Sequence, residues 1–167
     1  MGPGGTVIID DATSYITLVS GLPSGGVQNT FTWTITKGGC SASDFVNVYN
    51  NEFTISAGGP YESCDNTIEM LAENPGVGYG VWKAVDDDDE DKIQSPSVFN
   101  TEILDLEPGN SFFKWTVYRN GCEASDEATV VNNTIEANAG TYIPICEDEV
   151  NLSAEFIPGT ASGFWEL

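Results

Sequence analysis

The 167-residue sequence contains no histidine, and only five Lys and Arg residues stand against 26 Asp and Glu. Without histidine, the commonest general base, the Ser-His and Cys-His catalytic pairs and histidine metal sites are all missing. The net charge of −21 leaves no basic patch that could bind phosphate groups. We therefore predict that the protein is not an enzyme and has no nucleic-acid partner.

Long apolar segments are also missing. No apolar run approaches the roughly 20 residues of a membrane-spanning helix. Anionic lipid headgroups would repel the acidic surface, so we expect no membrane insertion. Residues 1–5 lack the apolar core of a signal peptide.

Helical periodicity is absent as well, since no long stretch has apolar residues at helical spacing. The 18 glycines and 8 prolines, together with many Thr, Asn, Val and Ile residues, favour short strands joined by turns. We therefore predict an all-β fold.

An internal repeat, with a period of about half the chain length, organises the sequence. Residues matched at one constant offset include Trp33 and Trp115, Cys40 and Cys122, Asp44 and Asp126, Cys64 and Cys146, Met70 and Leu152, and Ala72 and Ala154. Gly80-Val81-Trp82 matches Gly163-Phe164-Trp165 after one inserted residue. Because two Trp pairs and two Cys pairs stay in register, we interpret the chain as part of a tandem array.

Within each repeat, apolar and polar residues alternate as they do in strands. Phe31, Trp33 and Ile35 point to one side, with threonines between them. Lys37-Gly38-Gly39 is typical of a hairpin turn. A unit of this size, with many short strands and frequent turns, indicates a two-sheet β-sandwich.

The repeat register also predicts the domain boundaries. We expect one complete repeat at 53–133, the C-terminal part of a preceding repeat at 1–52 and the N-terminal part of a following repeat at 134–167. An alternative frame, with two permuted repeats at 1–84 and 85–167, stays open.

The spacing of aromatic residues supports the first frame. Trp82 is followed by Phe99 within the complete repeat. If the last residue were joined to the first, Tyr15 would follow Trp165 at the same spacing. The chain therefore has the pattern of a window taken from a continuous array.

Two stretches resemble a known family. Residues 137–154 (ANAGTYIPICEDEVNLSA) resemble the opening of PKD-like and immunoglobulin-like repeats, and residues 29–48 (NTFTWTITKGGCSASDFVNV) resemble their closing hairpin. The combination is similar to repeats of giant cell-surface adhesins of Bacteroidota, including gliding-motility adhesins exported by the type IX system. The resemblance implies tandem Ig-like (PKD-like) β-sandwich repeats in an extracellular, filament-like adhesin on the cell surface.

The four cysteines, Cys40, Cys64, Cys122 and Cys146, fall at two positions per repeat, which favours one disulfide per repeat. Cys64 with Cys122 is the pairing inside the complete repeat. The alternative frame favours Cys40 with Cys64 and Cys122 with Cys146. Zinc is the weaker interpretation, because no C-x-x-C pair and no histidine is present.

An acidic run follows the Trp82 strand. It consists of Asp86, Asp87, Asp88, Asp89, Glu90 and Asp91. Calcium prefers such oxygen ligands, but the run lacks the spacing of a known calcium loop. Two interpretations stay open, a calcium site and a solvated loop. Apart from calcium, we expect no cofactor.

The four tryptophans, Trp33, Trp82, Trp115 and Trp165, recur at the repeat spacing and are expected to pack in the core. Phe112 and Tyr118 are the better candidates for exposed aromatics. The sequence therefore favours a structural or adhesive repeat module whose partners are neighbouring repeats and a surface polysaccharide or an abiotic surface. The alternative is a polysaccharide- or calcium-binding accessory module of a secreted protein.

Overall fold

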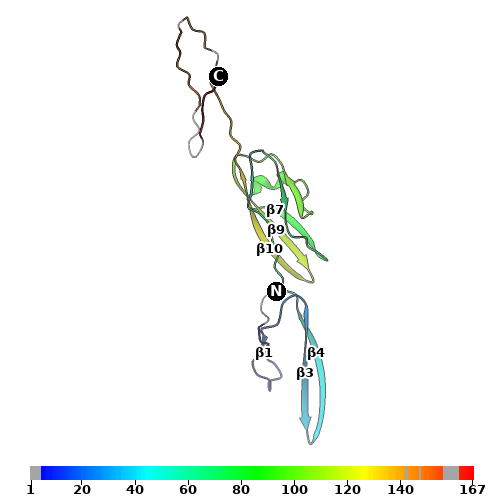
Figure 1. The fold of residues 1–167 in the computed structure, drawn as a ribbon. Coiled ribbons are helices and arrows are strands. Elements are labelled where there is room, and N and C mark those ends of the chain that lie inside the picture. Colours follow the sequence, from blue (N-terminus) through cyan, green and yellow to red (C-terminus); the bar gives the residue numbers. More distant parts are fainter. Residues whose placement is uncertain (1–4, 142, 147, 156–161) are drawn as a thin grey trace.

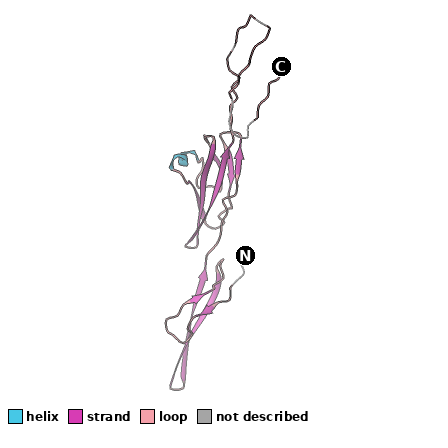
Figure 2. Ribbon diagram, turned by 90° about the vertical axis from the view of Figure 1, so that its left-hand side faces the viewer, coloured by secondary structure: helices cyan, strands magenta, loops and turns pink. Residues whose placement is uncertain are grey.

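A computed structural model describes residues 5–141, 143–146, 148–155 and 162–167, and gives no side-chain description for Asp87 and Asp88. The chain has three consecutive parts (Figure 1). Residues 5–52 form two two-stranded sheets, residues 53–134 form a β-sandwich, and the described residues after 134 are loop. Figures 1 and 2 both place the first and last parts at opposite ends of the sandwich.

The central sandwich is built from two sheets. Its four-stranded sheet has the order β5 (Tyr61–Ser63), β10 (Cys122–Asn132), β9 (Gly109–Arg119), β7 (Tyr79–Ala84). Its two-stranded sheet pairs β6 (Ile68–Leu71) with β8 (Asn100–Ile103). β5 runs parallel to β10 and all other pairs are antiparallel. A 3-10 helix, η1 (Asp87–Lys92), lies between β7 and β8 in the sequence.

Among the residues that the structure describes, all buried apolar side chains lie in this central part. In β9, every second side chain from Ser111 to Val117 is buried, as strand alternation requires. Trp82 and Trp115 are fully buried, with ring centroids 5.2 Å apart. The apolar core consists of Ile55, Ala57, Met70, Ala72, Trp82, Ile93, Ile103, Leu106, Phe113, Trp115, Val117, Ala128 and Val130.

The N-terminal part contains the same kinds of strand but no buried residue between 5 and 52. β1 (Ile8–Ile9) pairs with β2 (Val19–Ser20), and β3 (Val27–Lys37) pairs with β4 (Cys40–Asn50), both antiparallel. The two pairs leave large apolar side chains open to solvent. The strands of this part therefore pair without a hydrophobic core of their own.

The described residues between 135 and 167 contain no strand or helix, and none of them is buried. The predicted all-β sandwich is confirmed by the sheets of the central part. Within the described residues, no helix has the length and apolar character needed to cross a membrane.

Candidate functional site

The two ends of the chain reproduce parts of the central sandwich, beginning with its long hairpin. β9 and β10 pair with Arg119 opposite Cys122 and Gly109 opposite Asn132. β3 and β4 have the same length and the same register, with Lys37 opposite Cys40 and Val27 opposite Asn50. The offset that relates Trp33 to Trp115 in the sequence thus also relates two identical patterns of backbone pairing.

The segment before each hairpin is also repeated. Its equivalent residues are two positions further apart in the sequence than the equivalent residues of the hairpins. Ile93 bridges Ile103 in the sandwich, and Ile9 pairs with Val19 at the N-terminal end. The backbone hydrogen bonds coincide, since Gln94 N–H donates to Glu102 O and Asp10 N–H donates to Leu18 O, each at 3.0 Å. A side-chain bond is shared as well, from Ser95 N–H to Thr101 Oγ1 and from Asp11 N–H to Thr17 Oγ1, each at 3.0 Å.

One further bond ties this segment to its hairpin in both places. Asn132 Nδ2 donates to Leu106 O at 2.7 Å, and Asn50 Nδ2 donates to Leu22 O at 3.0 Å. Residues 8–52 therefore have the local structure of the rear half of the sandwich.

The C-terminal segment reproduces the front half. Glu73 N–H donates to Ser56 O at 2.8 Å, and one repeat period later Glu155 N–H donates to Asn138 O at 2.8 Å. The turn is also shared, because Gly58 N–H donates to Ser56 Oγ at 3.1 Å and Gly140 N–H donates to Asn138 Oδ1 at 2.9 Å. The loop closed at 56–73 is therefore formed again at 138–155.

Equivalent side chains differ sharply in burial. Trp115 is fully buried, whereas its equivalent Trp33 is 45% exposed. Met70 is fully buried, and its equivalent Leu152 is 56% exposed. The apolar side chains at the N-terminal end line a groove of ≈ 670 Å³, among them Ile9, Val19, Leu22, Phe31, Trp33 and Val48. This groove is the candidate functional site.

The expectation that the tryptophans pack in the core is confirmed for Trp82 and Trp115 and is wrong for the other two. Trp33 is nearly half exposed and Trp165 is 54% exposed. The physical reason is that each of them lies in half a sandwich, without the facing sheet that covers its equivalent. Phe112 is 40% exposed, as expected, while Tyr118 is half-buried and stacks on Tyr79 with ring centroids 5.1 Å apart.

All four cysteines, Cys40, Cys64, Cys122 and Cys146, are free thiols in this chain. Cys122 begins β10, and Cys64 follows Ser63, which pairs with the last residue of the same strand. Ten steps along a strand span about 33 Å, far beyond the roughly 6 Å between the Cα atoms of a disulfide. The pairing expected inside the complete repeat is therefore not formed within one sandwich.

Residues 87–91 of the acidic run lie in η1, where Asp89 pairs with Lys92 of the same helix and Glu90 bonds to the adjacent strand β7. Asp89 Oδ1 lies 2.7 Å from Lys92 Nζ, with the two side chains 14% and 16% exposed. Glu90 accepts a hydrogen bond from Ala84 N–H at 2.8 Å. Among the residues that the structure describes, no three acidic or cysteine side chains are grouped as a metal site.

The ion pair shifts both groups away from their ordinary titration ranges. Burial raises the pKa of Asp89, but hydrogen bonds from Lys92 and Ser111 outweigh it and hold this pKa below the usual value. The hydrogen bond to Asp89 raises the pKa of Lys92. This carboxylate therefore stabilises η1 itself, because its ion-pair partner lies in the same helix.

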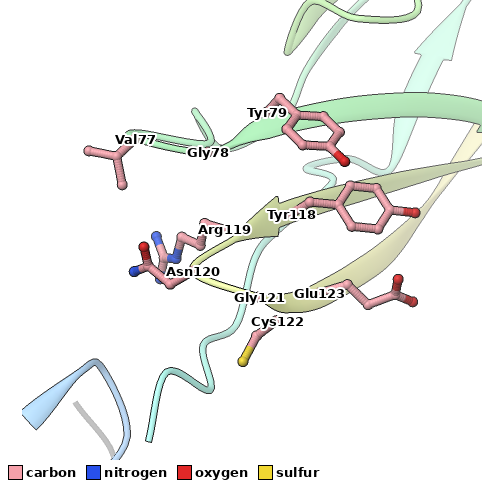
Figure 3. A pocket seen from close by; sticks show the side chains of 9 residues that line it. All are labelled: Val77, Gly78, Tyr79, Tyr118, Arg119, Asn120, Gly121, Cys122 and Glu123. Atoms are coloured by element: carbon pink, nitrogen blue, oxygen red, sulfur yellow. The ribbon is translucent and has the colours of Figure 1, made fainter. Parts of the chain in front are cut away.

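A contact between the N-terminal part and the sandwich was not apparent from the sequence. Asn51 Nδ2 donates to Asn120 O at 3.2 Å across this boundary, and beside it the Arg119 guanidinium lies 3.9 Å from the centroid of the ring of Phe53, the first residue of the sandwich. Cys122 is next to this hairpin tip, in a shallow pocket that also includes the stacked Tyr79 and Tyr118 (Figure 3). The tip of β9–β10 thus meets the end of the preceding hairpin, and the only sequence signal is the repeat period itself.

Neither a protein-family model nor a curated protein matches the chain. Two solved structures are similar to parts of it. The PKD domain of human KIAA0319 is 20% identical with a TM-score of 0.43, and the match covers 53% of this chain and 88% of that chain. Extracellular domains 3–5 of Drosophila OTK are 13% identical with a TM-score of 0.41, covering 62% of this chain and 39% of that chain. The fold assignment rests on the sheets and core described above.

Proposed function

We propose that the chain is a structural and adhesive module of an extracellular tandem array, with one complete repeat at 53–133. The observation that carries this proposal is the repetition of sandwich hydrogen bonds on both sides of the complete sandwich. Residues 1–52 then belong to a preceding repeat and residues 134–167 to a following one. In the rival frame the division would fall between 84 and 85, inside the stretch from Ile55 to Val130 that forms the core.

The contact at the hairpin tip supports a semi-rigid array. Asn120 O accepts a hydrogen bond from Asn51 of the preceding repeat, and Arg119 packs beside it on Phe53, the first residue of the complete repeat. Repeated at every junction, these contacts limit bending between successive repeats. Repeats that contact only their neighbours give length, and length projects a contact surface away from the cell.

The acidic composition fits this role. A net charge of −21 on 167 residues keeps parallel filaments apart by repulsion and favours solubility. The resemblance of residues 29–48 and 137–154 to giant adhesin repeats of Bacteroidota supports a place on the cell surface, type IX export, and a part in attachment or gliding. The proposed contacts of such a filament are a surface polysaccharide or an abiotic surface, and the module is not catalytic.

A tandem fusion tests the repeat frame. Two copies of the chain are joined end to end, so that residues 134–167 of the first run directly into residues 1–52 of the second. Amide hydrogen exchange of the second copy's β3–β4 hairpin should slow to the rate of its β9–β10 hairpin, because a third sandwich forms at the junction. Equal exchange of β3–β4 in the fusion and in a dilute single copy would refute the frame.

A flow assay tests the adhesive role separately. Beads coated with the fusion should stay attached under shear to glass or to polysaccharide-coated glass, and beads coated with an unrelated acidic protein should not. Loss of both kinds of attachment would leave a purely structural module. A calcium-dependent rise in melting temperature, or glycan binding by the single sandwich, would favour the accessory-module alternative.

A further inference from the structure

We propose that the outer face of the four-stranded sheet binds an uncharged polysaccharide, with the stacked rings of Tyr79 and Tyr118 as its platform. The inference rests on the adhesive role in the proposed function and adds a site and a ligand class to it. All the residues that form the site lie in the complete repeat, so it does not depend on either end of the chain.

The two tyrosine rings form the platform at one end of the sheet. Tyr79 of β7 lies directly opposite Tyr118 of β9, and the ring centroids are 5.1 Å apart with an interplanar angle of 21°. Tyr79 is 67% exposed and Tyr118 is half-buried. Two aromatic rings in contact, one of them mostly open to solvent, give a broad apolar surface with hydroxyl groups at its edge.

A glycine allows the two rings to meet. A Cβ atom at Gly78 would lie 2.4 Å from Tyr118 O and 2.8 Å from Arg119 Cβ, so another residue would push the start of β7 away from β9. Gly78 therefore lets β7 remain paired with β9 as far as Tyr79. The shallow pocket beside the rings has a volume of ≈ 500 Å³ and also includes Glu123.

This glutamate completes the row of side chains. Glu123 of β10 is exposed and lies opposite Tyr118. In Figure 3 the two rings and the Glu123 carboxyl group extend to the same side, whereas Arg119 and Cys122 extend to the other side. Sugar rings have apolar C–H faces that pack on aromatic rings, and hydroxyl groups that donate hydrogen bonds to carboxylates. The row thus combines the two kinds of contact that a sugar unit makes.

The repeat architecture does not require these side chains. The equivalents of Tyr79, Tyr118 and Glu123 are small hydroxyl residues, Ser162, Thr36 and Ser41. The β3–β4 hairpin has the same length and register as β9–β10 without an aromatic residue at this position. The tyrosines are therefore an addition to the repeat that the hairpin does not need for its own pairing, which favours a role in binding.

The platform stays exposed inside an array. The preceding part of the chain touches the hairpin tip through Asn51 and Asn120, and Tyr79 is 67% exposed with that part in place. Figures 1 and 2 show that the residues after 134 leave the sandwich at its opposite end. Neither neighbouring repeat therefore covers the two rings.

The outer face extends beyond the two rings along β9. The side chains of β9 that share this face with Tyr118 are Thr116, Lys114 and Phe112. Phe112 is 40% exposed, and six strand steps place it about 20 Å from Tyr118. Aromatic surfaces at that separation on one sheet face, with polar side chains between them, fit an extended polymer better than a single sugar.

The charges of this face select a polymer without charged groups. The outward charged side chains of β7, β9 and β10 are Lys83, Lys114, Glu123 and Glu127, two of each sign. Lys114 Nζ lies 3.6 Å from Glu127 Oε1, so these two charges offset each other. The net charge of −21 on the whole chain repels polyanions. A face of balanced charge on such a protein is complementary to an uncharged polysaccharide.

The experiment is attachment under flow, with beads that carry the tandem fusion at equal density. The surfaces are films of cellulose and of dextran, two uncharged glucose polymers, and of alginate, a polyuronate. Wild-type beads should attach to at least one uncharged film and not to alginate, because many weak contacts on one bead act together. The attachment should be equal in 20 mM and 500 mM NaCl, since salt does not screen ring contacts.

A double variant, Tyr79→Ser with Tyr118→Thr, tests the platform. It installs the residues that the array itself has at the equivalent positions, so the sandwich should still fold. The number of attached beads should fall at least about tenfold, because two ring contacts are lost at every site on the bead. Tyr79→Phe keeps the ring and should attach as the wild type does.

The matched control is Tyr49→Val. Tyr49 is 51% exposed on the outer face of the preceding hairpin, and its equivalent in the central sandwich is Val131. Beads with this variant should attach normally. Urea unfolding followed by tryptophan fluorescence checks that each variant is folded. If the double variant is not, Tyr79→Ser alone takes its place, since that side chain is mostly exposed.

Three results would overturn the inference. Wild-type beads that attach to neither uncharged film, or double-variant beads that attach as well as the wild type, would exclude the site. Stronger attachment to alginate than to the glucose polymers would exclude the uncharged class. Self-association of the fusion that the double variant abolishes would assign the face to a second copy of the chain.

Failure of this site and failure of the proposed function give different results. If the fusion forms its junction sandwich and double-variant beads still attach to polysaccharide, the adhesive array stands and this site alone fails. If hydrogen exchange of the second copy's β3–β4 hairpin does not slow in the fusion, the repeat frame fails whatever the beads do.

Discussion

The β9–β10 hairpin and the β3–β4 hairpin have equal lengths, equal register and matching tryptophans, yet only the first lies in a core. Trp115 is fully buried, while Trp33 is nearly half exposed. The difference is the front half of the sandwich, which covers β9 and is missing over β3. Local pairing and turn chemistry are thus enough to form the hairpin, and burial depends on residues supplied from elsewhere.

The largest expected difference between the hairpins comes from truncating their tryptophans. Trp115→Ala should destabilise the central sandwich by about 3–5 kcal/mol, because it leaves a cavity in a packed core. Trp33→Ala should change the same transition by less than about 0.5 kcal/mol in a dilute monomer, as an exposed surface change does. Urea unfolding followed at low protein concentration measures both. Equal losses would show that the two parts share one core.

Substitutions at the equivalent glycines Gly80 and Gly163 give a second comparison between the central sandwich and an end of the chain. Gly80→Val forces a side chain into the Trp115 ring and should lower the free energy of unfolding of the central sandwich by about 1–3 kcal/mol or more. Gly163→Val should leave the unfolding midpoint of the monomer unchanged, because a Cβ atom there would meet no heavy atom of the described residues within 4 Å, its chain neighbours aside. Thermal melts of the two variants give the test, and a tolerated Gly80→Val would contradict the tight approach of Trp115 to β7.

The asparagine hydrogen bond that both hairpins make should show a smaller difference in stability on substitution. Asn132 is buried and donates to Leu106 O, so Asn132→Ala leaves a carbonyl without its partner and should cost about 1–3 kcal/mol. Asn50 makes the equivalent bond to Leu22 O in a more open site, where water can replace it. Asn50→Ala should therefore have little effect on the urea midpoint, and a loss as large as that of Asn132→Ala would contradict this comparison.

The smallest contrast concerns pH, because only the central part has the Asp89–Lys92 ion pair. The Asp89 pKa is lowered on folding, so its stabilising contribution is present above the unfolded value of 3.8 and is lost as the pH falls through the folded value. The Lys92 pKa is raised, so its contribution is present below 10.5 and is lost as the pH rises through the folded value.

The melting temperature of Asp89→Asn relative to wild type checks this. The variant should melt lower at pH 7, and the difference in melting temperature should narrow in acid as the pH falls below 3.8 and through the lowered pKa of Asp89 in the folded state. Glu107→Gln is the control, since Glu107 acts on Lys92 only through its charge. A gap that persists unchanged in acid would show that the ion pair is not its cause.

Much of the fold followed from the sequence alone. The alternation of Phe31, Trp33 and Ile35 predicted a strand, and Lys37-Gly38-Gly39 predicted the turn that follows it. Those features are local, so they specify pairing directly. The acidic run was harder to interpret, because the structural use of Asp89 depends on Lys92 and Ser111, which only folding brings close.

The candidate site could be predicted only in part. The repeat showed which residues are equivalent, but equal residue types had unequal surroundings. Trp33 and Trp165 carry the core pattern without being covered, and sequence periodicity contains no information about whether a facing sheet is present. The expected pairing of Cys64 with Cys122 failed for a related reason, because two residues in one repeat can lie at opposite ends of one strand.

By itself the sequence determined an all-β, acidic, repeated chain, since strand alternation, turn residues and charge are properties of short stretches. Tertiary structure decided which copy of each repeated residue is buried and which thiols can meet. It also showed that the two ends repeat local hydrogen bonds of the rear and the front of the central sandwich. The physical reason is that burial requires two surfaces in contact, and a sequence pattern describes only one of them.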